Sequence, residues 1–117
     1  MQSPIITLKD QGVDFIATLK YRTAEEGGRK TPAFSGYRPQ VKFSFSEMQT
    51  SGQQTFIDAE VVYPGDTVKA EFKILSVALF ANCLEEGMNF EFREGSRIIG
   101  IGEIIEIVNE KLRKITP

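Results

Sequence analysis

The chain has 117 residues, of which 41% are hydrophobic and 26% charged, with a formal net charge of −2. This balance is typical of one folded domain over residues 1–117. It excludes a disordered chain, and no apolar run reaches the ~20 residues that span a bilayer, so we expect a cytoplasmic protein without membrane contact. With no histidine and one cysteine, Cys83, the sequence predicts no metal site, no internal disulfide and little capacity for proton transfer near neutral pH.

Period-two alternation of apolar and polar side chains, which places the apolar ones on one face of a strand, recurs along the chain. It predicts about six strands, over residues 14–22, 39–46, 56–62, 68–74, 90–93 and 98–108. The fourth is long enough to continue toward Leu79. We interpret the aromatic residues that follow this alternation as core: Phe15, Phe43, Phe45, Phe72, Phe90 and Phe92.

Turn-forming residues separate these runs, at 25–28, 50–52, 64–66, 85–87 and 93–96. Helical turns are expected only around 78–84 and 110–114. Many short strands with regular turns favour a β-sandwich or a closed barrel, and the pattern alone does not choose between them. The two Glu-Glu-Gly sequences are interpreted as solvated turns, and Cys83 as a thiol without chemistry.

Three blocks of sequence carry a specific resemblance. The first is Glu-Glu-Gly-Gly-Arg-Lys-Thr-Pro at 25–32, followed by Phe34 and by Gly-Tyr-Arg-Pro-Gln at 36–40. Pro-Gly-Asp at 64–66 and the block from 85 to 102 follow in the same order. Together they resemble the third domain of elongation factor Tu over residues 14–108. The resemblance implies an all-β fold, a six-stranded antiparallel closed β-barrel, with short extensions at both ends.

The resemblance also implies a binding role in translation. In the family this domain packs against the GTPase domain, helps to bind aminoacyl-tRNA and touches the exchange factor Ts, and by itself it hydrolyses nothing. The present sequence has no Gly-x-x-x-x-Gly-Lys-Ser/Thr loop, so we expect a free-standing copy of the domain with no nucleotide site, no cofactor and no catalytic residue.

Carried across by residue, the family's RNA-backbone contacts fall on Arg29, Gln40 and the turn Arg93-Glu94-Gly95. Arginine offers a planar fork of donors to phosphate, and glutamine reaches ribose hydroxyls. There are also departures from the family: its lysine on the fourth strand falls near Ser76, its histidine is replaced by Lys30, and about four residues are added around 80–83. These departures weaken the expected RNA site.

Three aromatic residues, Phe34, Tyr37 and Phe80, fall outside the strand alternation and are expected, with Arg38, to form an exposed protein-contact face. For Arg29 and Arg38 the alternative is structural: they could bond loop carbonyls and hold the long hairpin in place. Two functional hypotheses therefore remain: an RNA-binding module, for tRNA or another RNA, and a protein-interaction module that binds a translation-related partner or a second copy. The weakened RNA set favours the protein-interaction module.

Overall fold

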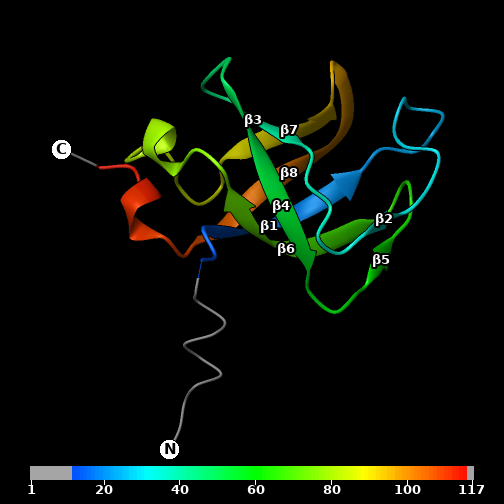
Figure 1. Cartoon of the computed structure of the whole chain (residues 1–117), viewed down its shortest axis with the longest axis horizontal. Helices are drawn as coiled ribbons and strands as arrows, with labels where there is room; N and C mark the ends of the chain where they lie inside the picture. Colours follow the sequence, from blue (N-terminus) through cyan, green and yellow to red (C-terminus); the bar gives the residue numbers. More distant parts are fainter. Residues whose placement is uncertain (1–11, 116–117) are drawn as a thin grey trace, which may run out of the picture.

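The computed structural model describes residues 12–115, and the structural statements below concern that part of the chain (Figure 1). It contains eight strands and two short 3₁₀ turns. In chain order these are β1 (Phe15–Tyr21), β2 (Ala33–Phe34), β3 (Gln40–Phe43), β4 (Gln49–Phe56), β5 (Val61–Val62), β6 (Thr67–Ile74), η1 (Val77–Phe80), β7 (Asn89–Glu94), β8 (Arg97–Ile107) and η2 (Glu110–Leu112).

Six of the strands form a closed barrel in the order β1-β6-β4-β3-β7-β8, and every neighbouring pair is antiparallel. The barrel closes because β8 pairs with β1, with Tyr21 opposite Gly100. The six-stranded antiparallel closed barrel expected from the resemblance is thereby confirmed. Closure pairs the wall strands on both sides, so the wall has no free edge.

The barrel interior is filled by the inward residues of the alternating strands. Phe15 stacks on Phe72, with ring centroids 4.8 Å apart, and meets the rings of Phe43 and Phe90 edge to face. Two glycines of β8 make room for this aromatic core: a β-carbon on Gly100 would overlap the ring of Phe92, and one on Gly102 would overlap Phe90. Glycine is therefore required here for close packing, as small barrels often need small residues opposite large ones.

The predicted turn at 50–52 and the predicted strand at 56–62 are both wrong. Residues 50–52 lie inside β4, which has an outward Gln, Ser and Thr face and pairs with both β3 and β6. Gly52 fits there because a β-carbon would lie 2.7 Å from the Cγ2 atom of Val41. The chain instead turns after Phe56, at Asp58, whose φ is +67°.

One end of the barrel carries a separate two-stranded sheet. There β2 pairs antiparallel with β5, so that Ala33 lies opposite Val62 and Phe34 opposite Val61. Ala33 and Val62 are buried, whereas Phe34 faces solvent. Figure 1 shows this sheet on the side of the barrel opposite to the two 3₁₀ turns. We call it the β2–β5 sheet.

The other end of the barrel is closed by the loop after β6 and by the segment after β8. Backbone bonds join the two, from Asn82 N to Lys111 O (2.9 Å) and from Leu84 N to Leu112 O (2.8 Å). Leu84 and Leu112 are fully buried. The turns expected around 78–84 and 110–114 are thus present as η1 and η2.

Two aromatic residues lie where the sequence did not predict them. Phe80 was expected on an exposed contact face, but it is 1% exposed and packs edge to face on Phe43 with ring centroids 5.1 Å apart. It closes the open end of the barrel, which the strand residues alone leave uncovered. Phe45 was expected in the core, but β3 ends at Phe43, and Phe45 lies in the following connection with 48% of its surface exposed.

Candidate functional site

The residues that resemble the family's RNA contacts gather around the turn between β7 and β8. Arg29 comes from the long connection between β1 and β2, and its Nη1 donates to Oε2 of Glu94 at the end of β7. Tyr37, from the connection between β2 and β3, donates its hydroxyl to the same oxygen. The guanidinium carbon of Arg29 also lies 4.8 Å from the centroid of the Tyr37 ring. We call these three residues the Arg29–Tyr37–Glu94 cluster.

Arg29 also bonds its own loop. Its Nε donates to the carbonyl of Thr31 (3.3 Å) and its Nη2 to the carbonyl of Pro32 (3.2 Å). These are the loop-carbonyl bonds of the structural alternative, and they stiffen the β1–β2 connection, which the bond from Arg29 to Glu94 joins to the end of β7. With a fourth bond from Nη2 to the Thr31 hydroxyl (3.2 Å), four of the five guanidinium N–H donors are already used within the chain.

The charges in this cluster favour the ionised pair. Burial opposes ionisation of Glu94, but bonds from Tyr37 and Arg29 outweigh it and hold the pKa of that carboxyl below its usual value. Burial, together with the bond to Glu94, raises the pKa of the Tyr37 hydroxyl. Arg29 follows the same pattern, since its pKa is raised by Glu94 and Tyr37 despite partial burial. At neutral pH the cluster is thus a cation, an anion and a neutral phenol.

The remaining members of the RNA set lie beside this cluster. Gln40 is exposed at the start of β3, directly opposite Arg93 on β7. Arg93 donates through Nε and Nη2 to Oε1 of Glu91, at 2.9 and 2.6 Å. Gly95 makes the turn into β8 with a φ of +63°, a conformation that side chains disfavour. All five residues therefore lie at one end of the barrel, and both arginines are paired with carboxylates.

A shallow depression of about 320 Å³ lies over the cluster, lined by Arg29, Lys30, Thr31, Glu94 and Arg97. Arg97 donates from Nη2 to Oε1 of Glu94 at 3.4 Å. Three cationic side chains thus line the depression with a single carboxylate. This is the part of the surface that could best accept an anion such as a phosphate.

The expected protein-contact residues separate into different places. Phe34 is 63% exposed on the outer face of the β2–β5 sheet. Tyr37 is half-buried and turned toward Glu94, while Arg38 is exposed and lines a depression on the barrel wall together with Lys73 and Leu75. Phe80 is in the core. Phe34 is therefore the member of that set with a widely exposed aromatic ring.

Two further residues, in β5 and directly after it, were missed from the sequence. Val61 is the cross-strand partner of Phe34 in β5, and Tyr63, which is 57% exposed, directly follows β5 where that strand ends at Val62. The alternation of Val61, Val62 and Tyr63 just before the Pro-Gly turn is the sequence signal for this exposed surface. The strand predicted over 56–62 places Val61 and Val62 in the barrel wall instead, which hides that signal. Phe34, Val61 and Tyr63 are called the Phe34 patch below.

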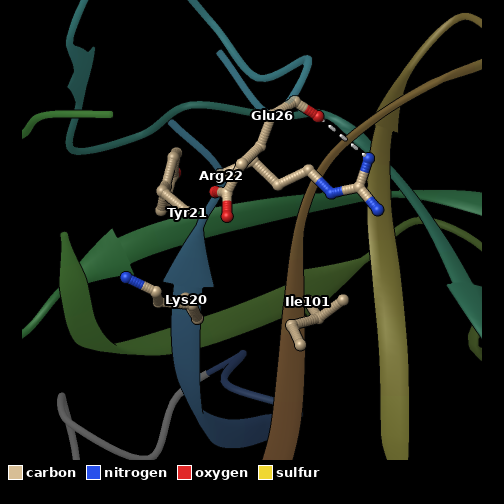
Figure 2. Close-up of a pocket in the computed structure, with 5 residues that line it drawn as sticks. All are labelled: Lys20, Tyr21, Arg22, Glu26 and Ile101. Atoms are coloured by element: carbon tan, nitrogen blue, oxygen red, sulfur yellow. Dashed lines mark hydrogen bonds between the residues drawn. The ribbon is translucent and has the colours of Figure 1, made fainter. Parts of the chain in front are cut away.

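A second depression, of about 430 Å³, lies on the barrel wall and is lined by Lys20, Tyr21, Arg22, Glu26 and Ile101 (Figure 2). The guanidinium of Arg22 reaches across it to the carbonyl of Glu26, at 3.4 Å (Figure 2). Lys20 donates to the carbonyl of Gly65 (2.6 Å). Both cations are thus used to hold loops, and none of the five lining residues belongs to the sites predicted from the sequence.

The two Glu-Glu-Gly sequences have structural roles. Glu26 accepts a bond from Thr23 N (2.9 Å), and Glu86 accepts bonds from Ile107 N (3.0 Å) and Arg113 Nη1 (2.8 Å). These bonds lower the pKa of both carboxyls, in each case mainly through the backbone donor. Cys83 is partly buried, with its Sγ 3.3 Å from the carbonyl of Ala81. Across residues 12–115, no three His, Cys, Asp or Glu side chains come together as a metal site would require.

No helix within the described residues is long and apolar enough to cross a membrane. The family model of the elongation factor Tu C-terminal domain matches residues 10–108 of the chain. That match spans the barrel, the β2–β5 sheet and the Arg29–Tyr37–Glu94 cluster. The chain belongs to the elongation factor Tu C-terminal domain family, and it is related to modules of translation factors.

Proposed function

We propose that this chain is a non-catalytic protein-interaction module whose contact surface is the Phe34 patch. The observation that carries the proposal is the exposure of two large aromatic rings, Phe34 at 63% on the β2–β5 sheet and Tyr63 at 57% directly after β5. Aromatic residues that combine apolar area with few rotatable bonds are enriched where proteins bind one another.

The patch is held rigidly before any partner arrives. Ser35 N bonds to Glu60 O (2.9 Å), Gly36 N to Gln54 O (2.7 Å) and Tyr37 N to Phe34 O (3.0 Å). The hydroxyl of Ser35 also accepts a bond from Phe56 N (3.0 Å). The turn that carries Phe34 is thus tied to β4 and β5, so little conformational entropy would be lost on binding.

The pairing of Arg29 with Glu94 supports a protein partner over RNA. A phosphate at Arg29 would have to compete with a carboxylate whose ion pair is partly buried, with side-chain exposures of 22% and 31%. Arg93 is likewise engaged by Glu91. Both arginines of the RNA set therefore start from a neutralised state, and with a net charge of −2 the chain offers no general attraction to a polyanion.

The test is affinity capture with the wild-type chain, Phe34→Ser, and the control Ile101→Ser, an aliphatic residue 53% exposed on the barrel wall. We expect a translation-related protein to be retained by wild type and control, at low and at high salt, and to be lost with Phe34→Ser. Equal capture by all three chains, or capture of nothing specific, would refute the proposal.

RNA binding is the alternative function, and the depression lined by Arg29, Lys30 and Arg97 is the observation in its favour. If RNA is the ligand, retention of tRNA on a filter falls steeply as salt increases, because counterion release then contributes less to binding. Arg29→Ala lowers retention in that case, while Phe34→Ser leaves it unchanged. The two functions thus respond to different substitutions and to salt in different ways.

A further inference from the structure

The β2–β5 sheet has an edge that no other strand covers. Within residues 12–115, β5 has β2 as its one neighbour, whereas each strand of the barrel wall has two. A strand at an edge presents unpaired N–H and C=O groups, which are a template for a further strand. The small sheet therefore differs from the barrel wall, whose strands are paired on both sides.

The direction of the backbone groups of β5 follows from its pairing with β2. Ser35 N donates to Glu60 O (2.9 Å), so this pair is hydrogen-bonded, and bonded and non-bonded pairs alternate along an antiparallel ladder. The next pair, Phe34 with Val61, is therefore a non-bonded one. Its N–H and C=O groups face outward, so those of Val61 point away from β2, toward the uncovered side of β5.

The neighbouring backbone groups are already used by the chain itself. Asp66 N donates to Tyr63 O (2.9 Å) and Tyr63 N donates to Oδ2 of Asp66 (3.0 Å), so the turn after β5 is closed. On the other edge of the sheet, Phe34 O accepts a bond from Tyr37 N (3.0 Å). Over residues 12–115, no backbone group outside the sheet bonds to Val61. The edge is thus most open at Val61.

The side chains beside this edge indicate which kind of strand fits it. Phe34 and Val61 lie directly opposite each other, so their side chains share one face, where Phe34 is 63% exposed. Exposed acidic residues flank β5 on both sides: Asp58, Glu60 and Asp66. In the part of the chain that the structure describes, none of the three belongs to an ion pair. A strand that alternates apolar and basic residues therefore matches this edge best.

A second copy of the chain does not match the edge. Two β5 edges side by side would bring the acidic residues of both chains together, and like charges across a strand pair destabilise it. Charged side chains at an edge prevent edge-to-edge pairing of identical proteins in this way. The same acidic residues attract a basic segment of another protein.

We infer that the partner of the Phe34 patch is an extended basic peptide segment, which adds to β5 as a further strand through main-chain bonds to Val61. The inference rests on the proposed function and specifies its partner class: a protein segment that alternates apolar residues with Lys or Arg. In strand addition, main-chain bonds supply affinity and alternate side chains supply specificity. Here the apolar side chains of the segment cover Phe34 and Val61, and its cations lie near Asp58 and Glu60.

The test uses the full chain and a synthetic heptapeptide of alternating valine and lysine with blocked ends. NMR measures amide hydrogen exchange without the peptide and with about 5 mM of it, above the dissociation constant on the order of 1 mM expected for so short a strand. Exchange of the Val61 amide should slow about fivefold at this concentration, because its N–H then bonds to the peptide. The amide of Val62, which faces β2, should change little. An unchanged exchange rate at Val61 overturns the inference.

Substitutions at Val61 test the main-chain bonds. Val61→Pro removes the outward N–H and leaves the bonds to β2 in place, so it should weaken peptide binding about tenfold, as measured from the chemical shift of the Phe34 amide. Val61→Thr is the matched control, since it keeps the N–H and should bind nearly as the wild type does. Circular dichroism establishes that each variant is folded, and the exchange rate in the wild type decides the matter if Val61→Pro is not. Equal binding by the two folded variants contradicts the inference.

The charge of the edge is tested with a second heptapeptide, of alternating valine and glutamate. The wild type should bind the lysine peptide about tenfold more tightly than the glutamate peptide, and Glu60→Lys should reduce that preference. Equal binding of the two peptides by the wild type would show that the acidic residues do not select the partner, and the basic segment would then be wrong.

Affinity capture with Val61→Pro separates a failure of this inference from a failure of the proposed function. If Val61→Pro retains the translation-related protein while Phe34→Ser loses it, the patch binds its partner without strand addition, so the inference is wrong and the proposed function stands. If the wild type captures nothing specific but the lysine peptide still protects the Val61 amide, the proposed function is wrong, and β5 nevertheless accepts a basic strand.

Discussion

Replacing Phe80 by alanine tests whether the loop after β6 contributes to the core. Phe80 is 1% exposed and makes edge-to-face contacts with Phe43 and Phe45. Loss of a buried phenylalanine costs about 2–3 kcal/mol in transfer free energy, and each aromatic pair adds about 0.5–1 kcal/mol. We therefore expect Phe80→Ala to lower the free energy of unfolding by about 3–5 kcal/mol, a large part of the stability of a small domain.

The measurement is urea unfolding followed by circular dichroism, with Phe45→Ala as the matched control. Phe45 is 48% exposed but also makes ring contacts with Phe43 and Phe80, so its loss should cost about 2 kcal/mol. The slope of the unfolding free energy against urea should be the same for both variants, which makes their midpoints comparable. Equal losses for the two variants, or a loss below about 1 kcal/mol for Phe80→Ala, would show that burial of Phe80 contributes little and that our reasoning about this end of the barrel is wrong.

Three further substitutions probe other parts of the structure. Glu94→Gln should destabilise the chain at pH 7. The difference in stability from wild type should shrink as the pH falls below about 4.3, because Glu94 has a lowered pKa and its stabilising charge is lost on protonation. Thermal melts across pH would show this, and a difference that does not change with pH would contradict the ion pair. Gly102→Ala should cost about 3 kcal/mol, since the added methyl group would overlap the Phe90 ring, whereas Ile101→Ala on the outer face should cost less than about 1 kcal/mol. Tyr21→Phe should lower the free energy of unfolding, measured in urea, by about 1–3 kcal/mol, because it leaves the buried Oε1 of Gln54 without the hydroxyl that donates to it. Tyr63→Phe at the surface should have little effect. Similar losses of stability for the two variants would argue against the bond between Tyr21 and Gln54.

The strands with a clear apolar alternation could be predicted from the sequence, and β4 could not. In β1, β6 and β7 the inward residues are aromatic or aliphatic, so the period of two is plain. The inward positions of β4 include Thr50, Gly52 and Gln54, which are polar or small and resemble a turn. Gln54 is nevertheless fully buried, because the Tyr21 hydroxyl donates to it. Such a polar contact inside a core depends on a partner 33 residues away, so the sequence around Gln54 shows no pattern that would predict its burial.

The residues of the candidate site could be predicted from the sequence, but the ion pairs between them could not. The resemblance brought Arg29, Gln40 and the Arg93–Gly95 turn into one set, and the structure places them at one end of the barrel. That Arg29 and Glu94 neutralise each other depends on contact between residues 65 apart, which the sequence does not reveal. Phe80 was misjudged for a related reason: a residue outside every strand was expected at the surface, although a barrel also needs material to close its ends.

The pairing of β1 with β8 affects how the chain folds while the ribosome synthesises it. The seam joins the first strand of the barrel, Phe15–Tyr21, to the last strand of the barrel, Arg97–Ile107. During synthesis β1 must wait for β8 to emerge, and contacts so distant along the chain slow folding. Until then the aromatic side chains of the incomplete barrel are exposed to water and to other nascent chains. We therefore expect chaperones to bind the chain during its synthesis.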